Sequence, residues 1–457
     1  MPNRSLVAVL FGTFTLRFST GLTGGLLLYY LADLPKHGGS EVGSFAFGLI
    51  IATYYVAELV LSPIFGILSD RLGAHRLMQW GPVFGFAAVI ATALTTDLWL
   101  LGGTRLAEGA AAGASIPSIL GYIALATSRD EGLRGRTVAR FEAATLAGLG
   151  IGLVVAGPAW EVLARWAFIG NAGIYAISFA IYRWGVAELP LPPKDFEPVP
   201  VHSGELHPRR FDLARYRRVM SSPAVWLLAP TWIALNAVVG SWTTQSVFQL
   251  VREPSARFED QLLMGGFSPT QVSLGLGVAL LLFFAGLIFW GGRFKRFRRT
   301  TIIAFGDLGG LLMIGAIFGL NHSQGWPLPV VGLVVLAMGA GLFVLAGATP
   351  AALGLLADIT ETHPEDRGAV MGLYSVFLAV GQISGNLVSG GAAEWLGIDG
   401  LLAASLGLLI VALLPVRALR ASEHLVGAAA PHDTQELIRD ALGHPDGTEA
   451  SLGPPAR

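Results

Sequence analysis

The sequence contains no cysteine and few charged residues. Without a thiol the chain can form no disulfide, no thiolate metal site and no cysteine nucleophile. Charged residues make up 13% of its 457 residues, whereas roughly 25% are charged in an average soluble domain. A net charge of -1 provides no field that would attract nucleic acid. This composition argues against a cytosolic enzyme and against a nucleic-acid-binding protein.

Long apolar runs dominate the chain instead. Hydrophobic residues make up 53% of the sequence, and its mean hydropathy is +0.60. A helix needs about 20 mainly apolar residues to cross a bilayer. Twelve runs reach this length, at residues 5–32, 43–69, 77–96, 98–127, 138–163, 166–187, 223–250, 269–291, 300–320, 327–356, 368–394 and 399–419. We therefore predict an all-α, multi-pass membrane protein with twelve transmembrane helices.

Lysine and arginine are distributed unevenly between the two ends of these runs. Most of the 30 basic residues fall in loops on the same side as the N-terminus. The opposite loops contain only four, which are Lys36, Arg165, Arg252 and Arg257. Because basic loops stay in the cytoplasm, this imbalance predicts a cell-membrane protein with both termini cytoplasmic.

The longest interruption of the apolar pattern falls between the sixth and seventh runs. It separates an N-terminal half, residues 1–187, from a C-terminal half, residues 223–420, and a flexible tail follows at 421–457. The cytoplasmic linker 188–222 holds a Pro-rich stretch and then a basic stretch at 209–218. That basic stretch fits either an amphipathic helix on the anionic membrane surface or a solvated loop.

The two halves repeat each other in sequence. A shift of 233 residues superposes Pro117 on Pro350, Gly148 on Gly381, Gly152 on Gly385, Gly157 on Gly390 and Glu161 on Glu394. Two parallel repeats of six helices are the plan of a two-bundle secondary transporter, with a binding site near the bilayer midplane. No G-x-x-x-x-G-K-[ST] motif accompanies the repeat, so we expect neither an ATP-driven pump nor a bound cofactor.

A glycine- and charge-rich motif joins the second and third runs. It reads Gly66-Ile-Leu-Ser-Asp70-Arg71-Leu-Gly73-Ala-His75-Arg76. Its glycines permit a tight turn, and its charges can pair with neighbouring helix ends, which would latch one conformation of the two bundles. The spacing resembles the major facilitator superfamily signature and departs from it at His75. The resemblance implies two pseudo-symmetric six-helix bundles around a central site that opens alternately to each face.

The fourth run carries a charged pair in its apolar interior. Arg105 and Glu108 are three residues apart and so share one helical face. An ionised group is costly in the bilayer, so each should face a partner or a wet cavity. The string resembles the R-x-x-Q-G motif of the same family, whose Arg is implicated in proton coupling, with Glu108 in the Gln position. A structural ion pair and a titrating carboxylate are both open interpretations.

Two further charges fall near the middle of the first and second runs. Arg17 lies about twelve residues into its run, and Glu58 lies about eleven residues from the cytoplasmic end of its run, so both are deep in the membrane. Consecutive antiparallel helices are usually neighbours, so an Arg17–Glu58 pair is geometrically feasible. A purely structural role and a role in substrate or proton binding fit the sequence equally well.

Small residues mark the fifth run. Gly148, Gly152, Gly157 and Pro158 resemble the family's antiporter motif, although Glu161 and Val162 stand where that motif has two glycines. Small residues at this spacing also serve plain helix packing.

The family plan further implies that the seventh run lines the cavity. The candidates for the substrate cavity there are Trp232, Asn236, Trp242 and Gln245. An aromatic and apolar wall facing Arg and Glu suits amphiphilic molecules better than sugars.

These patterns together favour a proton-coupled exporter of a small amphiphilic compound. Proton-coupled uptake on the same scaffold is the first alternative. The second is a non-transporting membrane scaffold or assembly protein of the same fold. The expected partners are the substrate, protons and the lipid bilayer. We expect a monomer, no enzymatic activity, no metal and no nucleic acid.

Overall fold

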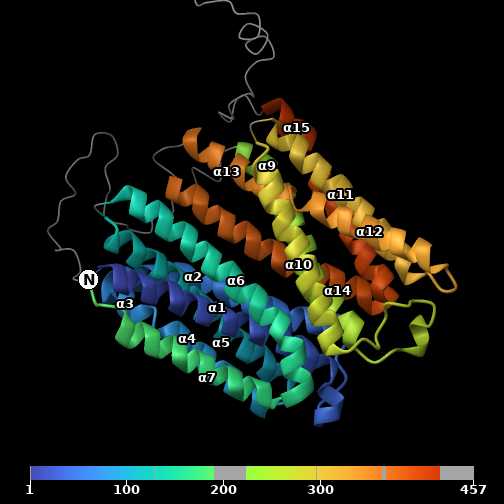
Figure 1. Ribbon diagram of the computed structural model, residues 1–457, viewed down its shortest axis with the longest axis horizontal. Helices are drawn as coiled ribbons and strands as arrows, with labels where there is room; N and C mark the ends of the chain where they lie inside the picture. Colours follow the sequence, from blue (N-terminus) through green and yellow to red (C-terminus); the bar gives the residue numbers. More distant parts are fainter. Residues whose placement is uncertain (1, 129, 190–222, 295, 363–366, 423–457) are drawn as a thin grey trace, which may run out of the picture.

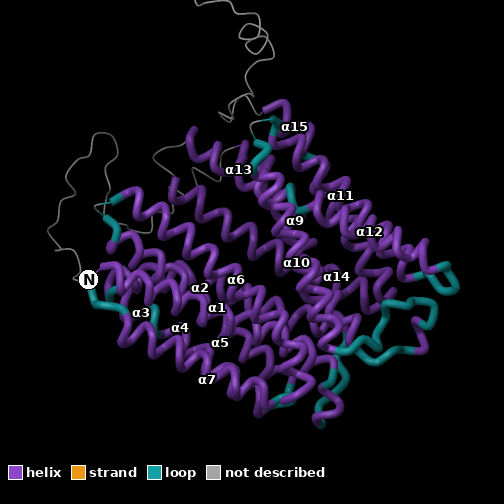
Figure 2. The backbone as a smooth tube through the Cα atoms, in the orientation of Figure 1, coloured by secondary structure: helices purple, strands orange, loops and turns teal. Residues whose placement is uncertain are grey.

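The computed structural model describes residues 2–128, 130–189, 223–294, 296–362 and 367–422. The predicted linker and tail therefore lie almost entirely outside the described residues. Helices and connecting loops make up the described part, which contains no strand (Figure 2).

The helices divide into two sequential sets. The first set is α1 (Pro2–Ala32), α2 (Ser44–Leu72), α3 (Ala74–Leu77), α4 (Trp80–Leu94), α5 (Leu98–Ala126), α6 (Glu131–Leu163) and α7 (Trp166–Ala180), with a π-helical turn η2 (Ile181–Gly185). The second set is α9 (Pro223–Val251), α10 (Pro269–Gly291), α11 (Arg299–Asn321), α12 (Leu328–Leu345), α13 (Ala348–Thr362), α14 (Arg367–Leu413) and α15 (Val416–Ser422). Short 3-10 turns occur in the loops, η1 (Leu34–His37) and η3 (Ala256–Phe258).

Ten helical stretches of the described chain are long and apolar enough to cross a membrane. Two features account for the difference from the twelve predicted runs. α14 covers two of the predicted runs. They meet at Gly397, where a φ of 62° interrupts the helical backbone. α7 is only 15 residues long before its π turn, although it occupies the sixth predicted run. The described helices are therefore consistent with twelve spans, and the protein is an all-α, multi-pass membrane protein.

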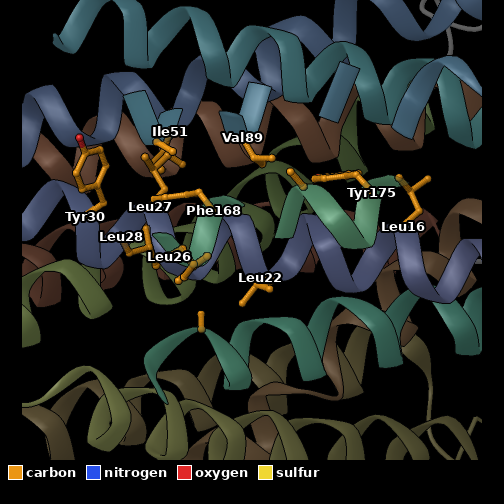
Figure 3. Close-up of a cluster of buried hydrophobic side chains, with 14 of the residues drawn as sticks. Leu16, Leu22, Leu26, Leu27, Leu28, Tyr30, Ile51, Val89, Phe168 and Tyr175 are labelled. Atoms are coloured by element: carbon orange, nitrogen blue, oxygen red, sulfur yellow. The ribbon is translucent and has the colours of Figure 1, made fainter. Parts of the chain in front are cut away.

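The two sets of helices form two groups that lie side by side (Figure 1). Each group has its own core of buried apolar side chains. Figure 3 shows the first core, where α1 contributes the buried side chains Leu16, Leu22, Leu26, Leu27 and Leu28. α7 contributes Phe168 and Tyr175 to the same core.

The sequence repeat corresponds to a repeated helix contact. Gly148 and Gly152 bring α6 against the backbone of α1, and a Cβ on either glycine would meet main-chain atoms of Phe14 or Phe18. Gly381 and Gly385 bring α14 against the backbone of α9 in the same way. Helices in lipid associate through such close backbone packing, because burial away from lipid yields no hydrophobic gain. The shift of 233 residues therefore superposes equivalent helix–helix contacts.

The two groups contact each other along two seams, α2 with α14 and α6 with α10. Among the described residues, the hydrogen bonds and ion pairs that cross between the groups all lie towards one end of the molecule. This end, which we call the closed end, carries the loops 33–43 and 252–268. In Figure 1 these loops lie at the end away from the N-terminus.

The glycine contacts generate a stability prediction. We expect Gly152→Ala and Gly385→Ala each to destabilise the protein by about 1–3 kcal/mol, because the new Cβ must displace a helix backbone. Gly103→Ala is the matched control, since no atom lies within 4 Å of a Cβ at that position of α5. The control should be neutral or stabilising by up to about 1 kcal/mol. Unfolding midpoints in detergent provide the measurement, and equal midpoints for all three variants would contradict the packing role.

Candidate functional site

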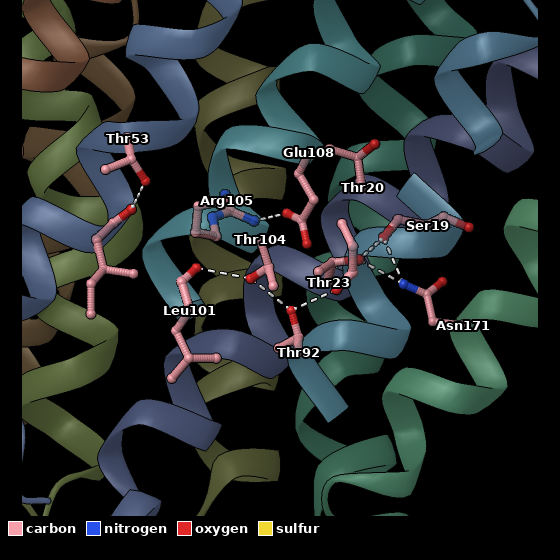
Figure 4. Close-up of polar contacts among 12 residues, drawn as sticks. Ser19, Thr20, Thr23, Thr53, Thr92, Leu101, Thr104, Arg105, Glu108 and Asn171 are labelled. Atoms are coloured by element: carbon pink, nitrogen blue, oxygen red, sulfur yellow. Dashed lines mark hydrogen bonds and ion pairs between the residues drawn. The ribbon is translucent and has the colours of Figure 1, made fainter. Parts of the chain in front are cut away.

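The most deeply buried ion pair among the described residues lies on α5. The carboxylate of Asp97 accepts a hydrogen bond from the Leu100 backbone N–H at 2.9 Å and so caps the start of this helix. Two turns further on, Arg105 Nη1 donates a hydrogen bond to Glu108 Oε2 (Figure 4). The side chains of Arg105 and Glu108 are 7% and 2% exposed, so the pair is almost completely removed from water.

Aromatic contact holds the arginine from the neighbouring helix. The Arg105 guanidinium lies 4.8 Å from the centre of the Tyr54 ring on α2, within cation–π range. Gly109 allows this approach, because a Cβ there would meet the Tyr54 carbonyl. Tyr54 belongs to none of the sequence motifs. Its signal was a tyrosine one helical turn from Glu58 in an otherwise apolar run.

The pair is not fully satisfied. Arg105 Nε and Glu108 Oε1 are both buried and have no hydrogen-bond partner among the described residues. A buried charged group without its full set of partners is costly, and this cost falls if a proton or a ligand group supplies the missing contact. The free Oε1 is therefore the atom of this cluster best suited to accept a proton.

Arg17 and Glu58 do not form an ion pair in the described structure. Arg17 is buried on α1 beside Gly148, and Glu58 is half-buried on α2. Neither side chain has a hydrogen bond or salt bridge among the described residues. The Arg17–Glu58 pair is not formed in this conformation, because Arg17 leaves α1 on the side of α6, where a Cβ on Gly148 would meet Arg17 Cβ.

Neutral polar side chains tie the helices around this cluster together (Figure 4). Asn171 Nδ2 on α7 donates to Thr23 Oγ1 at 2.7 Å and to the Ser19 carbonyl at 3.0 Å on α1. Thr92 on α4 donates to Thr104 Oγ1 on α5 at 2.9 Å. None of these residues belongs to a sequence motif, and their only sign in the sequence is a polar side chain within an apolar run.

The four candidates on α9 are engaged mainly with protein. Trp232 is buried in the second core, and Trp242 Nε1 donates to Ser405 Oγ at 3.0 Å. Gln245 Nε2 donates to the Ser44 carbonyl at 2.9 Å, which places Gln245 in the contact between the two groups. Asn236 is half-buried and donates to the Trp232 carbonyl on its own helix at 2.8 Å.

The predicted latch motif lies at the other end from the closed end. Gly66 is in α2, and Gly73 has a φ of 94° in the turn before α3. Arg71 is exposed, and Arg76 Nε donates to Glu188 of the same group at 3.1 Å. The side chain of Asp70 lies outside the described residues.

The small residues of α6 serve two contacts. Gly148 and Gly152 face α1, whereas Gly157 faces α10, where a Cβ would meet the Pro269 carbonyl and Ser273. Pro158 follows within the helix. The antiporter-like segment therefore packs both within its group and across the seam.

Comparison with known proteins identifies the relatives of this chain. Residues 9–265 and 259–446 match the family described as the Major Facilitator Superfamily. Multidrug resistance protein MdtG of Proteus mirabilis is 28% identical over 116 residues, covering 25% of this chain and 28% of that protein. The triacylglyceride transporter of Mycobacteroides abscessus is 26% identical over 319 residues, covering 64% of this chain and 57% of that protein. Both alignments thus span less than two thirds of the relative.

A solved structure has the same fold. The crystal structure of the nucleoside transporter NupG superposes with a TM-score of 0.67 over 91% of this chain and 98% of that one. The two sequences are 14% identical, so this likeness concerns the fold alone.

The buried pair generates a prediction about stability. Glu108→Ala should cost about 3–5 kcal/mol, because it leaves the Arg105 charge buried without its anion. The double variant Arg105→Met, Glu108→Leu should cost much less, since an apolar pair of similar volume removes both charges at once. Unfolding midpoints of the single variants Arg105→Met and Glu108→Leu and of the double variant form the cycle. A double variant as unstable as the sum of the single ones would contradict this account.

Proposed function

Because this chain belongs to the major facilitator superfamily, we propose that it exports a small amphiphilic organic compound in exchange for protons by alternating access. Its helices are those of a multi-pass membrane protein, and multidrug resistance proteins are among its relatives. The amphiphilic substrate, the direction of transport and the coupling to protons are the parts that this proposal adds.

The proposed conformational cycle follows from the location of the contacts between the groups. Lys36, Arg252 and Arg257, three of the few basic residues on the side opposite the N-terminus, lie in the closed-end loops. The positive-inside rule therefore supports placing the closed end on the outer side of the membrane and the other end on the cytoplasmic side. In this state a cytoplasmic substrate could enter between the groups, and rocking of the groups would then release it outside.

The buried carboxylate of Glu108 is the observation that carries the proposal of proton coupling. Its Oε2 binds Arg105, while its Oε1 has no partner among the described residues. A proton on Oε1 would neutralise the carboxylate and weaken its hold on Arg105. Substrate and proton would then compete for one anionic site, and this competition is the requirement for exchange.

Arg17, Glu58 and Tyr54 complete the proposed site. Arg17 on α1 and Glu58 on α2 form no salt bridge among the described residues, so both are candidates to bind a ligand group. The Tyr54 ring supplies an aromatic face beside Arg105. Charges and an aromatic surface together suit a compound that has both polar and apolar parts.

The proposal predicts a proton flux that depends on Glu108. In energised inside-out vesicles, adding lipophilic cations and neutral drugs one at a time should collapse the pH gradient for at least one compound. Glu108→Gln should lower this response at least about 100-fold, as expected when a required proton-transfer group is lost.

Glu259→Gln is the matched control, because Glu259 is exposed in a closed-end loop. It should respond like the parent protein. Unchanged proton flux in the Glu108→Gln variant would contradict a role of Glu108 in proton coupling. If the folded parent protein responds to none of the compounds, this result would contradict export by proton exchange.

A further inference from the structure

Two glutamates at equivalent positions of the repeat make equivalent contacts across the two seams. Glu161 near the end of α6 accepts a hydrogen bond from the backbone N–H of Thr270 at 3.0 Å. Glu394 in α14 accepts one from the backbone N–H of Phe45 at 3.2 Å. Thr270 and Phe45 are each the second residue of a helix, α10 and α2, in the opposite group. Each glutamate therefore bonds to the first turn of a helix that belongs to the other half of the protein.

The chemistry of a helix start explains why a carboxylate binds there. The first backbone N–H groups of a helix have no acceptor within the helix, and negative charge is favourable at this end. α2 begins after Gly43, which has no side chain to cap it, so Glu394 supplies the acceptor from the other group. In α10 Ser268 caps the N–H of Gln271, and Glu161 takes the N–H of Thr270.

A glycine one turn before each glutamate brings the helices close enough for this contact. A Cβ on Gly157 would meet the Pro269 carbonyl at the start of α10, and a Cβ on Gly390 would meet the Ser44 carbonyl at the start of α2. Gly157 N also donates to Ser273 Oγ at 2.9 Å. The two seams are thus two copies of one interface, related by exchange of the halves.

We propose that Glu161 and Glu394 are a matched pair of latches that hold the closed end shut. Each bond joins the two groups at the closed end, so both must break when this end opens. Both side chains are exposed, so on release they return to water without a large desolvation penalty. This inference rests on alternating access, which is part of the proposed function. It does not depend on the substrate, on protons or on the direction of transport.

The absence of cysteine allows a direct distance measurement. Spin labels on cysteines at Ser40 and Ala256, both exposed in closed-end loops of opposite groups, report the distance across the closed end. A second pair reports the distance across the other end. It consists of Leu72, the last residue of α2, and Leu414, which directly follows α14, and both are exposed. The distances are measured by pulsed electron paramagnetic resonance, in substrate-free protein and without a proton gradient.

Removing a latch should shift the population towards a longer closed-end distance and a shorter distance at the other end. Because the bonds are exposed, we expect each of Glu161→Ala and Glu394→Ala to raise the open-to-closed ratio about threefold, and the double variant to raise it about tenfold. The glutamine variants keep an acceptor oxygen and should shift the ratio less. Glu259→Gln, which alters an exposed charge in a closed-end loop, should leave both distances unchanged.

An unchanged ratio in both single variants overturns the proposal. If the double alanine variant fails to fold, the single alanine and glutamine variants decide the question. Caps with only a structural role would lower the unfolding midpoint and leave both distance distributions as in the parent. Since the distances are measured without transport, failure of the latches and failure of proton-coupled export are separate results.

Discussion

The cost of placing charge and unpaired backbone groups in a bilayer is the constraint on which this structure depends. It requires helices, whose backbone groups bond to one another within the segment. It also restricts charges inside the membrane to sites where a partner, water or a ligand compensates them. The buried pair Arg105 and Glu108 meets this condition only in part, since one oxygen of Glu108 has no partner among the described residues. The same constraint that shapes the fold therefore marks the candidate site.

Helix association follows from the same constraint. Because lipid is as apolar as the helix surfaces, close backbone contact replaces the hydrophobic effect as the force between helices. Glycines at equivalent positions of the two halves provide this contact: Gly152 of α6 packs against α1, and Gly385 of α14 packs against α9. Further along α6 and α14, Gly157 and Gly390 provide it between the halves. One pattern of small residues thus builds both the groups and the seams at which they meet.

The two halves share packing but differ in charge. α1, α2 and α5 carry Arg17, Glu58, Arg105 and Glu108 in their interiors, whereas the corresponding helices α9, α10 and α12 contain no charged residue. Amides and hydroxyls take their place on α9, and these bond largely to protein. These three pairs of helices therefore share a packing pattern but not their charges, and the buried charge of the second half, Asp307, lies on α11 instead.

The sequence by itself determined the apolar spans, the repeat and the shared face of Arg105 and Glu108. These depend on residues close together in the chain, and helical periodicity relates such residues directly. Only the tertiary structure decided that Arg17 and Glu58 do not form an ion pair, that Gln245 binds Ser44 of the other half, and that Glu161 and Glu394 cap helices across the seams. Contacts of this kind depend on the rotation and depth of each helix and on how the two groups lean together. Residue spacing along one helix does not specify these quantities.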